Sequence, residues 1–182
     1  MTADKTRFRT VDLAYIALFA VLMAVCAWIS IPLTVPFTLQ TFAVFAALAT
    51  LGGRRGLYAV VVYLLMGAVG LPVFSNFQGG LGVLLGTTGG YIVGFLVSAA
   101  LFWLLTARFG TSLPVTVCAC LLGLAVCYAF GTAWFLMVYT QTKGPMGLLS
   151  ALSACVFPFV LPDLVKLALA VLVSRRVRRY LK

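Results

Sequence analysis

Two oppositely charged side chains, Asp163 and Lys166, lie in a stretch that is otherwise apolar, residues 156–170. If this stretch is helical, residues three apart share one face and are close enough to pair. In a membrane-spanning helix each charge would cost about 2.5–3.5 kcal/mol on insertion scales. A pair of apolar residues would pack as well without the cost of removing charges from water. The pair therefore favours a polar ligand site over an ion pair that only sets helix packing.

Prolines and the absence of histidine narrow the chemistry of this pair. Pro158 and Pro162 interrupt backbone hydrogen bonds just before the two charges, which predicts a kink and free carbonyl groups beside a cavity. The chain contains no histidine, so Ser-His-Asp catalysis and the HExxH zinc site are excluded. The alternative to a binding protein is a membrane enzyme. Such an enzyme would have only Asp163 and Lys166 as its acid and base.

The five cysteines do not indicate a metal site. All of them lie inside apolar stretches, and Cys118 and Cys120 are two residues apart. On a helix this spacing directs the two side chains to different faces. Cysteines of this kind are small, polarizable core residues, so no metal and no cofactor are expected.

The overall composition places these residues in a membrane protein. Of the 182 residues, 64% are hydrophobic and 9% are charged, whereas soluble domains carry about 25% charged residues. A spanning helix needs about 20 mostly apolar residues, so six helices with their connections and tails use the whole chain, 1–182. The sequence predicts an all-α integral membrane protein, a six-transmembrane-helix bundle that forms a single domain. The helices are expected at 13–30, 40–51, 57–70, 90–106, 113–138 and 147–174.

The net charge of +10 is distributed unevenly along the chain. Eleven of the 13 basic residues lie in short tails, 1–11 and 175–182, or in two connections, 52–56 and 107–112. The positive-inside rule therefore predicts that both termini are cytoplasmic, and an even number of spans agrees. This placement indicates membrane topology and contact with anionic lipid, and not nucleic-acid binding. The connections on the opposite side are residues 31–39, 71–89 and 139–146. Together they hold a single basic residue, Lys143.

The lysines also exclude a nucleotide-hydrolysing domain. A P-loop requires a Gly-Lys-Ser/Thr sequence, because its lysine holds the phosphates. None of the four lysines in this chain follows a glycine. If the protein moves a solute uphill with ATP, the ATPase must therefore be on another chain.

Two uncharged connections on the opposite face supply further polar groups and are expected to be structured. The segment 71–91 contains glycines that permit close backbone approach and the amide of Asn76. The segment 31–41 adds the side chains of Thr38 and Gln40. Together with the charged pair they predict an outer-face cavity with apolar walls, which suits a small, largely apolar ligand with a polar head. The alternative is that 71–91 packs over the bundle and binds nothing.

A stripe of small residues marks one face of the first predicted helix. Ala17, Ala20, Ala24 and Ala27 recur at three- and four-residue spacing. Small residues in such a stripe allow another helix to approach closely. From the residues alone, packing within this bundle and contact with another subunit are equally good interpretations.

Four motifs carry a resemblance to a known family: VPFTLQT at 35–41, GLPVF at 70–74, GGLGVLLGTTGGYIVGF at 79–95 and PDLVK at 162–166. Nearly the whole chain resembles the BioY family, the biotin-specific S components, or substrate-capture subunits, of energy-coupling factor (ECF) transporters. The resemblance implies a six-helix protein of the bacterial cell membrane that captures biotin from the outer face and is not an enzyme. The implied partners are a membrane coupling subunit and two cytoplasmic ATPases. An S component for another small vitamin is the alternative within this class.

The resemblance also implies which residues hold biotin. In the family, a loop asparagine and the aspartate and lysine of the last helix bind the ligand, and these correspond to Asn76, Asp163 and Lys166. A carboxylate and an amide accept from the two N–H groups of the ureido ring, and an ammonium donates to its carbonyl or to biotin's carboxylate. The implied apolar contacts are Phe74, Phe77 and Tyr91, with Thr38 and Gln40 at the outer end. The resemblance further implies that Ala20 and Ala24 face the coupling subunit.

Overall fold

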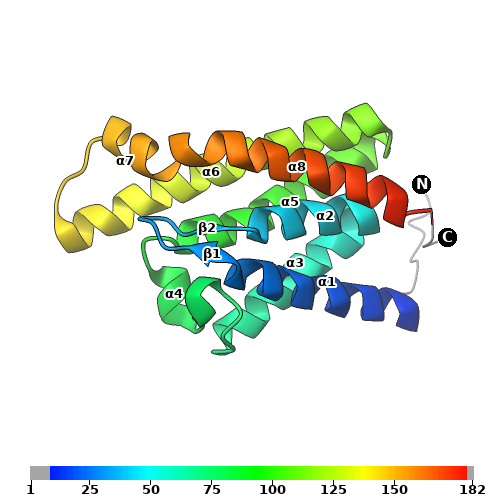
Figure 1. The fold of residues 1–182 in the computed structure, drawn as a ribbon, viewed down its shortest axis with the longest axis horizontal. Helices are drawn as coiled ribbons and strands as arrows, with labels where there is room; N and C mark the ends of the chain where they lie inside the picture. Colours follow the sequence, from blue (N-terminus) through cyan, green and yellow to red (C-terminus); the bar gives the residue numbers. More distant parts are fainter. Residues whose placement is uncertain (1–8, 180–182) are drawn as a thin grey trace.

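The protein is described here by a computed structural model covering residues 9–179. Three basic residues used in the topology argument, Lys5, Arg7 and Lys182, lie outside the described residues, as does most of the tail 1–11. Helices make up most of the molecule and run roughly along its long axis (Figure 1). In chain order the elements are α1 (Thr10–Trp28), β1 (Ser30–Ile31), β2 (Phe37–Thr38), α2 (Gln40–Leu51), α3 (Gly53–Ala68), η1 (Ser75–Phe77), α4 (Leu81–Leu85), α5 (Gly89–Phe109), α6 (Leu113–Lys143), α7 (Leu148–Cys155) and α8 (Phe157–Val177).

Four of the helices, α1, α5, α6 and α8, are long and apolar enough to cross a membrane. Helices α2 and α3 have 12 and 16 residues, which gives them lengths of about 18 and 24 Å at 1.5 Å per residue. The hydrocarbon core of a bilayer is about 30 Å thick. The prediction of a mostly helical membrane protein is therefore confirmed, with four helices of spanning length among the described residues.

The prediction of one continuous helix over 147–174 is wrong. The chain forms two helices, α7 and α8, which meet at Val156 with φ −125° and ψ −58°. Pro158 explains the break, because its ring and missing N–H exclude it from a helix interior but suit the first turn of a new helix. Pro162, by contrast, lies inside α8. The hydropathy of the sequence is continuous across this junction and gives no sign of it.

Helix α2 lies at the centre of the bundle. Ten of its 12 residues are buried, as expected for a helix that is apolar on all sides. It contacts α8, α3 and α1, while α5 packs along α6 and against α3. Phe45 of α2 is fully buried in the main core. Because Gln40 and Thr41 form the first turn of α2, this central helix carries polar side chains into the bundle.

Three of the four alanines in the predicted stripe, Ala20, Ala24 and Ala27, face the inside of this bundle, whereas Ala17 is exposed. Ala20 and Ala24 have exposed fractions of 0% and 3% and belong to the main core cluster. The outward face of α1 instead carries larger residues, among them Leu18, Val21 and Val25. The stripe allowed packing within the bundle or contact with another subunit. In the structure Ala20 and Ala24 pack within the bundle and are not on its surface.

The two ends of the bundle differ in chemistry. At the end where α1 begins and α8 ends (Figure 1), Arg55 pairs with the buried Asp12 at 3.1 Å, and Arg178 Nε donates to Thr50 O at 3.3 Å. Arg9 and Arg54 line a cavity at this same end. The opposite end carries the antiparallel hairpin β1–β2 and the short elements η1 and α4. Arg9, Arg54, Arg55 and Arg178 thus lie at one end of the bundle, away from these structured connections.

Candidate ligand-binding site

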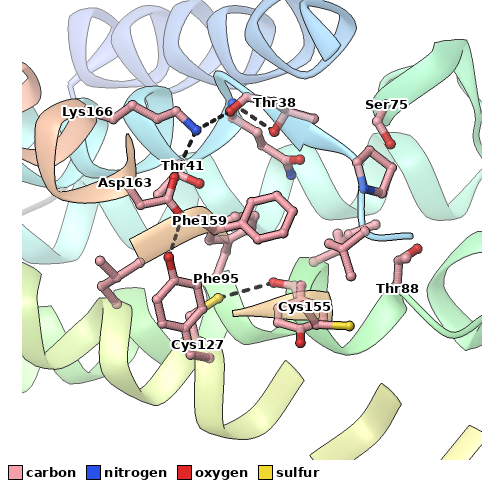
Figure 2. A pocket seen from close by; sticks show the side chains of 17 residues that line it. Thr38, Thr41, Ser75, Thr88, Phe95, Cys127, Cys155, Phe159, Asp163 and Lys166 are labelled. Carbon is pink, nitrogen blue, oxygen red and sulfur yellow. Dashed lines mark hydrogen bonds and ion pairs between the residues drawn. The ribbon is translucent and has the colours of Figure 1, made fainter. Parts of the chain in front are cut away.

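A cavity of about 640 Å³, including its open mouth, lies between the hairpin connection and helices α2, α5, α6, α7 and α8. Figure 2 shows side chains from all of these segments pointing into it. Most of the wall area is apolar, although nine of the 17 lining residues also carry a hydroxyl, amide or charged group. The walls are formed by Val35, Pro36, Thr38, Gln40, Thr41, Ser75, Thr88, Tyr91, Ile92, Phe95, Leu124, Cys127, Tyr128, Cys155, Phe159, Asp163 and Lys166.

The predicted ion pair lies in this cavity. Lys166 Nζ and Asp163 Oδ1 are 2.8 Å apart, and the two residues are only 6% and 4% exposed. Both come from α8, where Asp163 directly follows Pro162 and Lys166 lies about one turn further on. The pairing predicted from the i, i+3 spacing is therefore confirmed, and a charged pair is held in a chamber whose wall is largely apolar.

Lys166 also ties α8 to the hairpin connection. Its ammonium donates to the backbone carbonyl oxygen of Thr38 at 2.7 Å and lies 3.8 Å from the centroid of the Phe37 ring. The Phe37 ring in turn stacks on Phe159 of α8, with centroids 6.0 Å apart. A carboxylate, a carbonyl and an aromatic face together compensate the ammonium for the loss of water.

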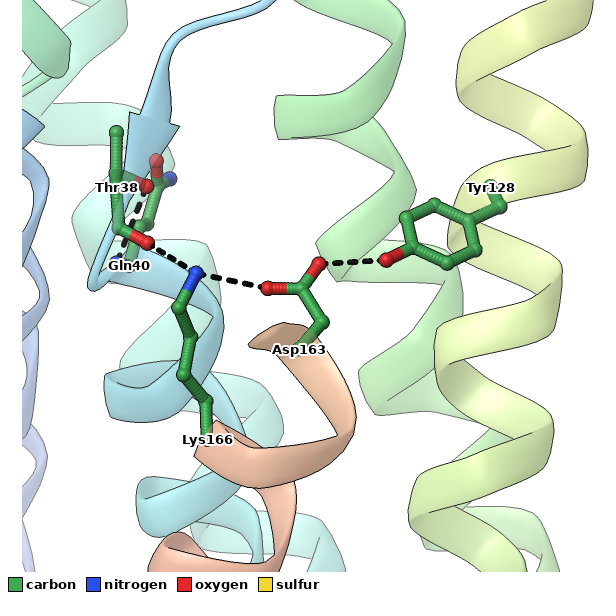
Figure 3. A network of polar contacts seen from close by, with 5 residues as sticks. All are labelled: Thr38, Gln40, Tyr128, Asp163 and Lys166. Carbon is green, nitrogen blue, oxygen red and sulfur yellow. Dashed lines mark hydrogen bonds and ion pairs between the residues drawn. The ribbon is translucent and has the colours of Figure 1, made fainter. Parts of the chain in front are cut away.

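Tyr128 holds the other oxygen of the acid, and sequence reasoning missed it. Its hydroxyl, on α6, donates to Asp163 Oδ2 at 2.7 Å (Figure 3). The Asp163 carboxylate therefore lies between Tyr128 on one side and Lys166 on the other. Tyr128 sits alone in a long apolar run, so no motif or spacing in the sequence could have selected it.

Gln40 brings an unsatisfied donor to the same chamber. Its side chain is 5% exposed and lines the cavity, yet its Nε2 atom has no hydrogen-bond partner. Its backbone N–H is satisfied by Thr38 Oγ1 at 3.2 Å. A buried amide without a partner costs free energy, so this nitrogen is suited to an acceptor brought by a ligand.

The sequence of the whole chain matches a known family. A sequence model of the BioY family matches residues 2–182. The chain belongs to the BioY family.

Curated relatives and a solved structure resemble this BioY-family chain over nearly all of its length. The biotin transporter BioY of Thermotoga maritima is 42% identical over 163 residues, which cover 89% of this chain and 92% of that protein. The probable biotin transporter BioY of Pyrococcus horikoshii is 36% identical over 168 residues, covering 92% and 96%. The crystal structure of the S component for biotin from an ECF-type ABC transporter superposes with a TM-score of 0.80 at 28% identity, covering 98% and 95%.

Five of the eight ligand-binding residues predicted for this BioY-family chain line the cavity. They are Thr38, Gln40, Tyr91, Asp163 and Lys166. Tyr91 reaches it from α5, where its hydroxyl shares a hydrogen bond of 3.0 Å with Thr132 Oγ1. The structure thus brings together residues from three separate parts of the sequence around one chamber.

The other three predicted residues lie outside the cavity. Asn76 is exposed, and its Oδ1 accepts from Ser30 Oγ at 3.1 Å. Phe77 is 63% exposed and stacks on Trp28. Phe74 is fully buried, edge-on against Tyr63. Of residues 74–77 only Ser75 lines the chamber. Asn76 and Phe77 have left-handed backbone conformations (φ 56° for both), and their side chains contact Ser30 of β1 and Trp28 of α1.

Gly131 of α6 gives this BioY-family site a testable packing constraint. A methyl group added there would overlap the Tyr91 ring. We expect Gly131→Ala to displace that ring into the cavity and to weaken ligand binding about tenfold, as overpacking of 1–3 kcal/mol implies. Gly123→Ala on the same helix is the matched control, since its added methyl would lie 3.4 Å from Phe45 Cε1, an ordinary contact. Equal affinities for the two variants would contradict the role given to Tyr91.

Proposed function

We propose that this chain is the substrate-capture subunit of an ECF-type transporter, with high affinity for biotin, and that it takes part in biotin uptake across the bacterial cell membrane. The observation that carries the proposal is the buried Asp163–Lys166 pair in a cavity whose wall is largely apolar. Membership of a family whose relatives are named biotin transporters supports the choice of ligand. Solute capture without chemical conversion requires no cofactor.

The polar groups of the cavity match those of biotin. The ureido ring offers two N–H donors and one carbonyl acceptor, and the valeryl chain ends in a carboxylate. In the proposal, Asp163 accepts a ureido N–H. Gln40 Nε2 and Lys166 are the donors available for the ligand's oxygen atoms, and Thr38 lies beside them. Tyr91 and Phe159 would contact the apolar bicycle and chain.

The proposed topology has six transmembrane segments with both termini in the cytoplasm. The gathering of Arg9, Arg54, Arg55 and Arg178 at one end supports this orientation through the positive-inside rule. The two shorter helices, α2 and α3, would complete their crossings with the connections beside them. The cavity would then face the outside, where the ligand arrives.

This orientation predicts a labelling pattern. A cysteine placed at Lys143, in a variant whose native Cys118 is replaced by serine, should react with an impermeant maleimide added to intact cells. A cysteine at Arg108 should react only after the cells are opened. The reverse pattern would contradict the proposed topology.

In the proposal, ATP hydrolysis is supplied by a membrane coupling subunit and two cytoplasmic ATPases. This division follows from the sequence, in which no lysine follows a glycine and a P-loop is therefore absent. The proposal predicts binding without transport when the chain is purified alone.

Equilibrium dialysis of the purified, detergent-solubilised protein against labelled biotin tests the function. We expect tight, saturable binding with the biotin recovered intact, and no displacement by thiamin or riboflavin. Displacement by another vitamin, with biotin bound weakly or not at all, would favour an S component for that vitamin. Loss of the biotin itself, with a new product formed, would favour a membrane enzyme that uses Asp163 and Lys166.

A further inference from the structure

Tyr128 is a polar wall residue that neither the motifs nor the resemblance singled out. Its hydroxyl projects from α6 and donates to Asp163 Oδ2 at 2.7 Å (Figure 3). The residue lines the cavity directly. Because Asp163 belongs to α8, this hydrogen bond crosses the bundle from one helix to another.

The two oxygens of the acid have separate donors. Lys166 Nζ donates to Oδ1 at 2.8 Å, and the Tyr128 hydroxyl donates to Oδ2 at 2.7 Å. A carboxylate has about four lone-pair positions. Two of these remain for a ligand once both donors are in place, and the donors on the two oxygens hold the carboxylate in one orientation.

We propose that Tyr128 is a positioning residue for ligand binding: it fixes the Asp163 carboxylate so that a remaining lone pair accepts an N–H group of the ligand. The inference rests on the proposed function, in which that N–H group belongs to the ureido ring. Tyr128 is assigned no role in contacting the ligand through its own proton, since that proton is committed to Asp163.

The same contacts place the hydrogen-bond donors and the acceptor on different sides of the cavity. Gln40 Nε2 and the Lys166 ammonium lie toward α2 and the hairpin, whereas the acceptor Asp163 is held toward α6 by Tyr128 (Figure 3). A ligand that carries N–H groups next to a carbonyl satisfies both sides at once. A ligand with acceptors only would leave Asp163 facing like-charged or acceptor atoms.

The variant Tyr128→Phe removes the hydroxyl and keeps the ring. We expect its dissociation constant for biotin to rise about tenfold, the usual cost of a lost hydrogen bond to a charged group. Tyr139→Phe is the matched control, because Tyr139 lies on the same helix, stacks on Phe135 and does not line the cavity. The control should bind biotin like the wild type. Thermal melts of both proteins establish that they are folded, and Tyr128→Leu serves as a second variant if Tyr128→Phe does not fold.

A double-mutant cycle separates positioning from simple helix packing. If Tyr128 acts through Asp163, then Tyr128→Phe should cause no further loss of affinity in an Asp163→Asn background. If Tyr128 only packs α6 against α8, the two losses should multiply. Multiplying losses, or unchanged affinity in folded Tyr128→Phe, would overturn the inference.

The controls also separate this inference from the proposed function. If neither the wild type nor Tyr139→Phe binds biotin, the proposed function fails and the positioning role fails with it. If both bind biotin tightly and Tyr128→Phe binds equally well, only the positioning role is wrong.

Discussion

Replacing the acid of the cavity should sharply weaken biotin binding: we expect Asp163→Asn to raise the dissociation constant between about tenfold and about a hundredfold. The substitution keeps the shape of the side chain but removes the charge on which Lys166 and Tyr128 converge. A ligand N–H that loses its hydrogen bond to a charged acceptor loses about 1.5–3 kcal/mol, and each 1.4 kcal/mol corresponds to about a tenfold change in affinity. Titration of the purified variant with labelled biotin measures the effect.

The chain provides a matched control for this substitution. Asp12 is also buried and also paired, with Arg55 at 3.1 Å, but it lies at the opposite end of the bundle from the hairpin. Asp12→Asn should lower thermal stability and leave biotin affinity unchanged. If both variants bind like the wild type, the assignment of the site is wrong even though the chain is a BioY protein. If both lose binding equally, the loss reports general destabilisation and not the site.

The second large effect is expected at the base of the pair. Lys166→Met keeps the length of the side chain but leaves the Thr38 carbonyl and the Asp163 carboxylate without their common donor. We expect biotin affinity to fall at least tenfold and the melting temperature to drop, because a buried charge is left unpaired. Lys143→Met, at the exposed end of α6, should change neither property.

Combining the two substitutions distinguishes a ligand site from a structural pair. In Asp163→Asn/Lys166→Met no unpaired buried charge remains, and neutral replacements of buried ion pairs are often as stable as the original. We therefore expect the double variant to regain thermal stability but not biotin binding. A double variant that binds biotin like the wild type would show that the pair serves only to pack the helices.

The sequence was informative where the residue type alone determines a large free-energy cost or a backbone preference. The charges of Asp163 and Lys166 are expensive in an apolar segment, so their pairing could be predicted without a structure. The bounds predicted for α2, 40–51, agree with Gln40–Leu51, because prolines precede that apolar run and glycines follow it. The high share of apolar residues and the low share of charged ones were enough to predict a helical membrane protein.

What the sequence could not predict depends on contacts between distant segments. The acceptor that Lys166 finds on the hairpin is a backbone carbonyl, and every residue has one. The residue types of Asn76 and Phe77 did not reveal their left-handed backbone conformations or their contacts with β1 and α1. Tyr128 becomes important only because α6 happens to pass beside Asp163, a matter of tertiary packing.

The burial of Ala20 and Ala24 illustrates the same limit. A stripe of small residues predicts a close helix approach, and the structure has one, but the sequence does not say which helix approaches. In the bundle, α1 packs against α2 and α3. The face of α1 that points outward is a different one, lined by larger residues such as Leu18 and Val21.

The central claim is that biotin binds in the cavity around Asp163 and Lys166. An experimental structure of the protein crystallised with biotin tests it most directly. We predict that the ureido ring lies within hydrogen-bond distance of the Asp163 carboxylate, with Gln40 Nε2 or Lys166 Nζ donating to an oxygen atom of the ligand. Biotin bound elsewhere on the protein, with the Asp163–Lys166 chamber unchanged and empty, would contradict the account.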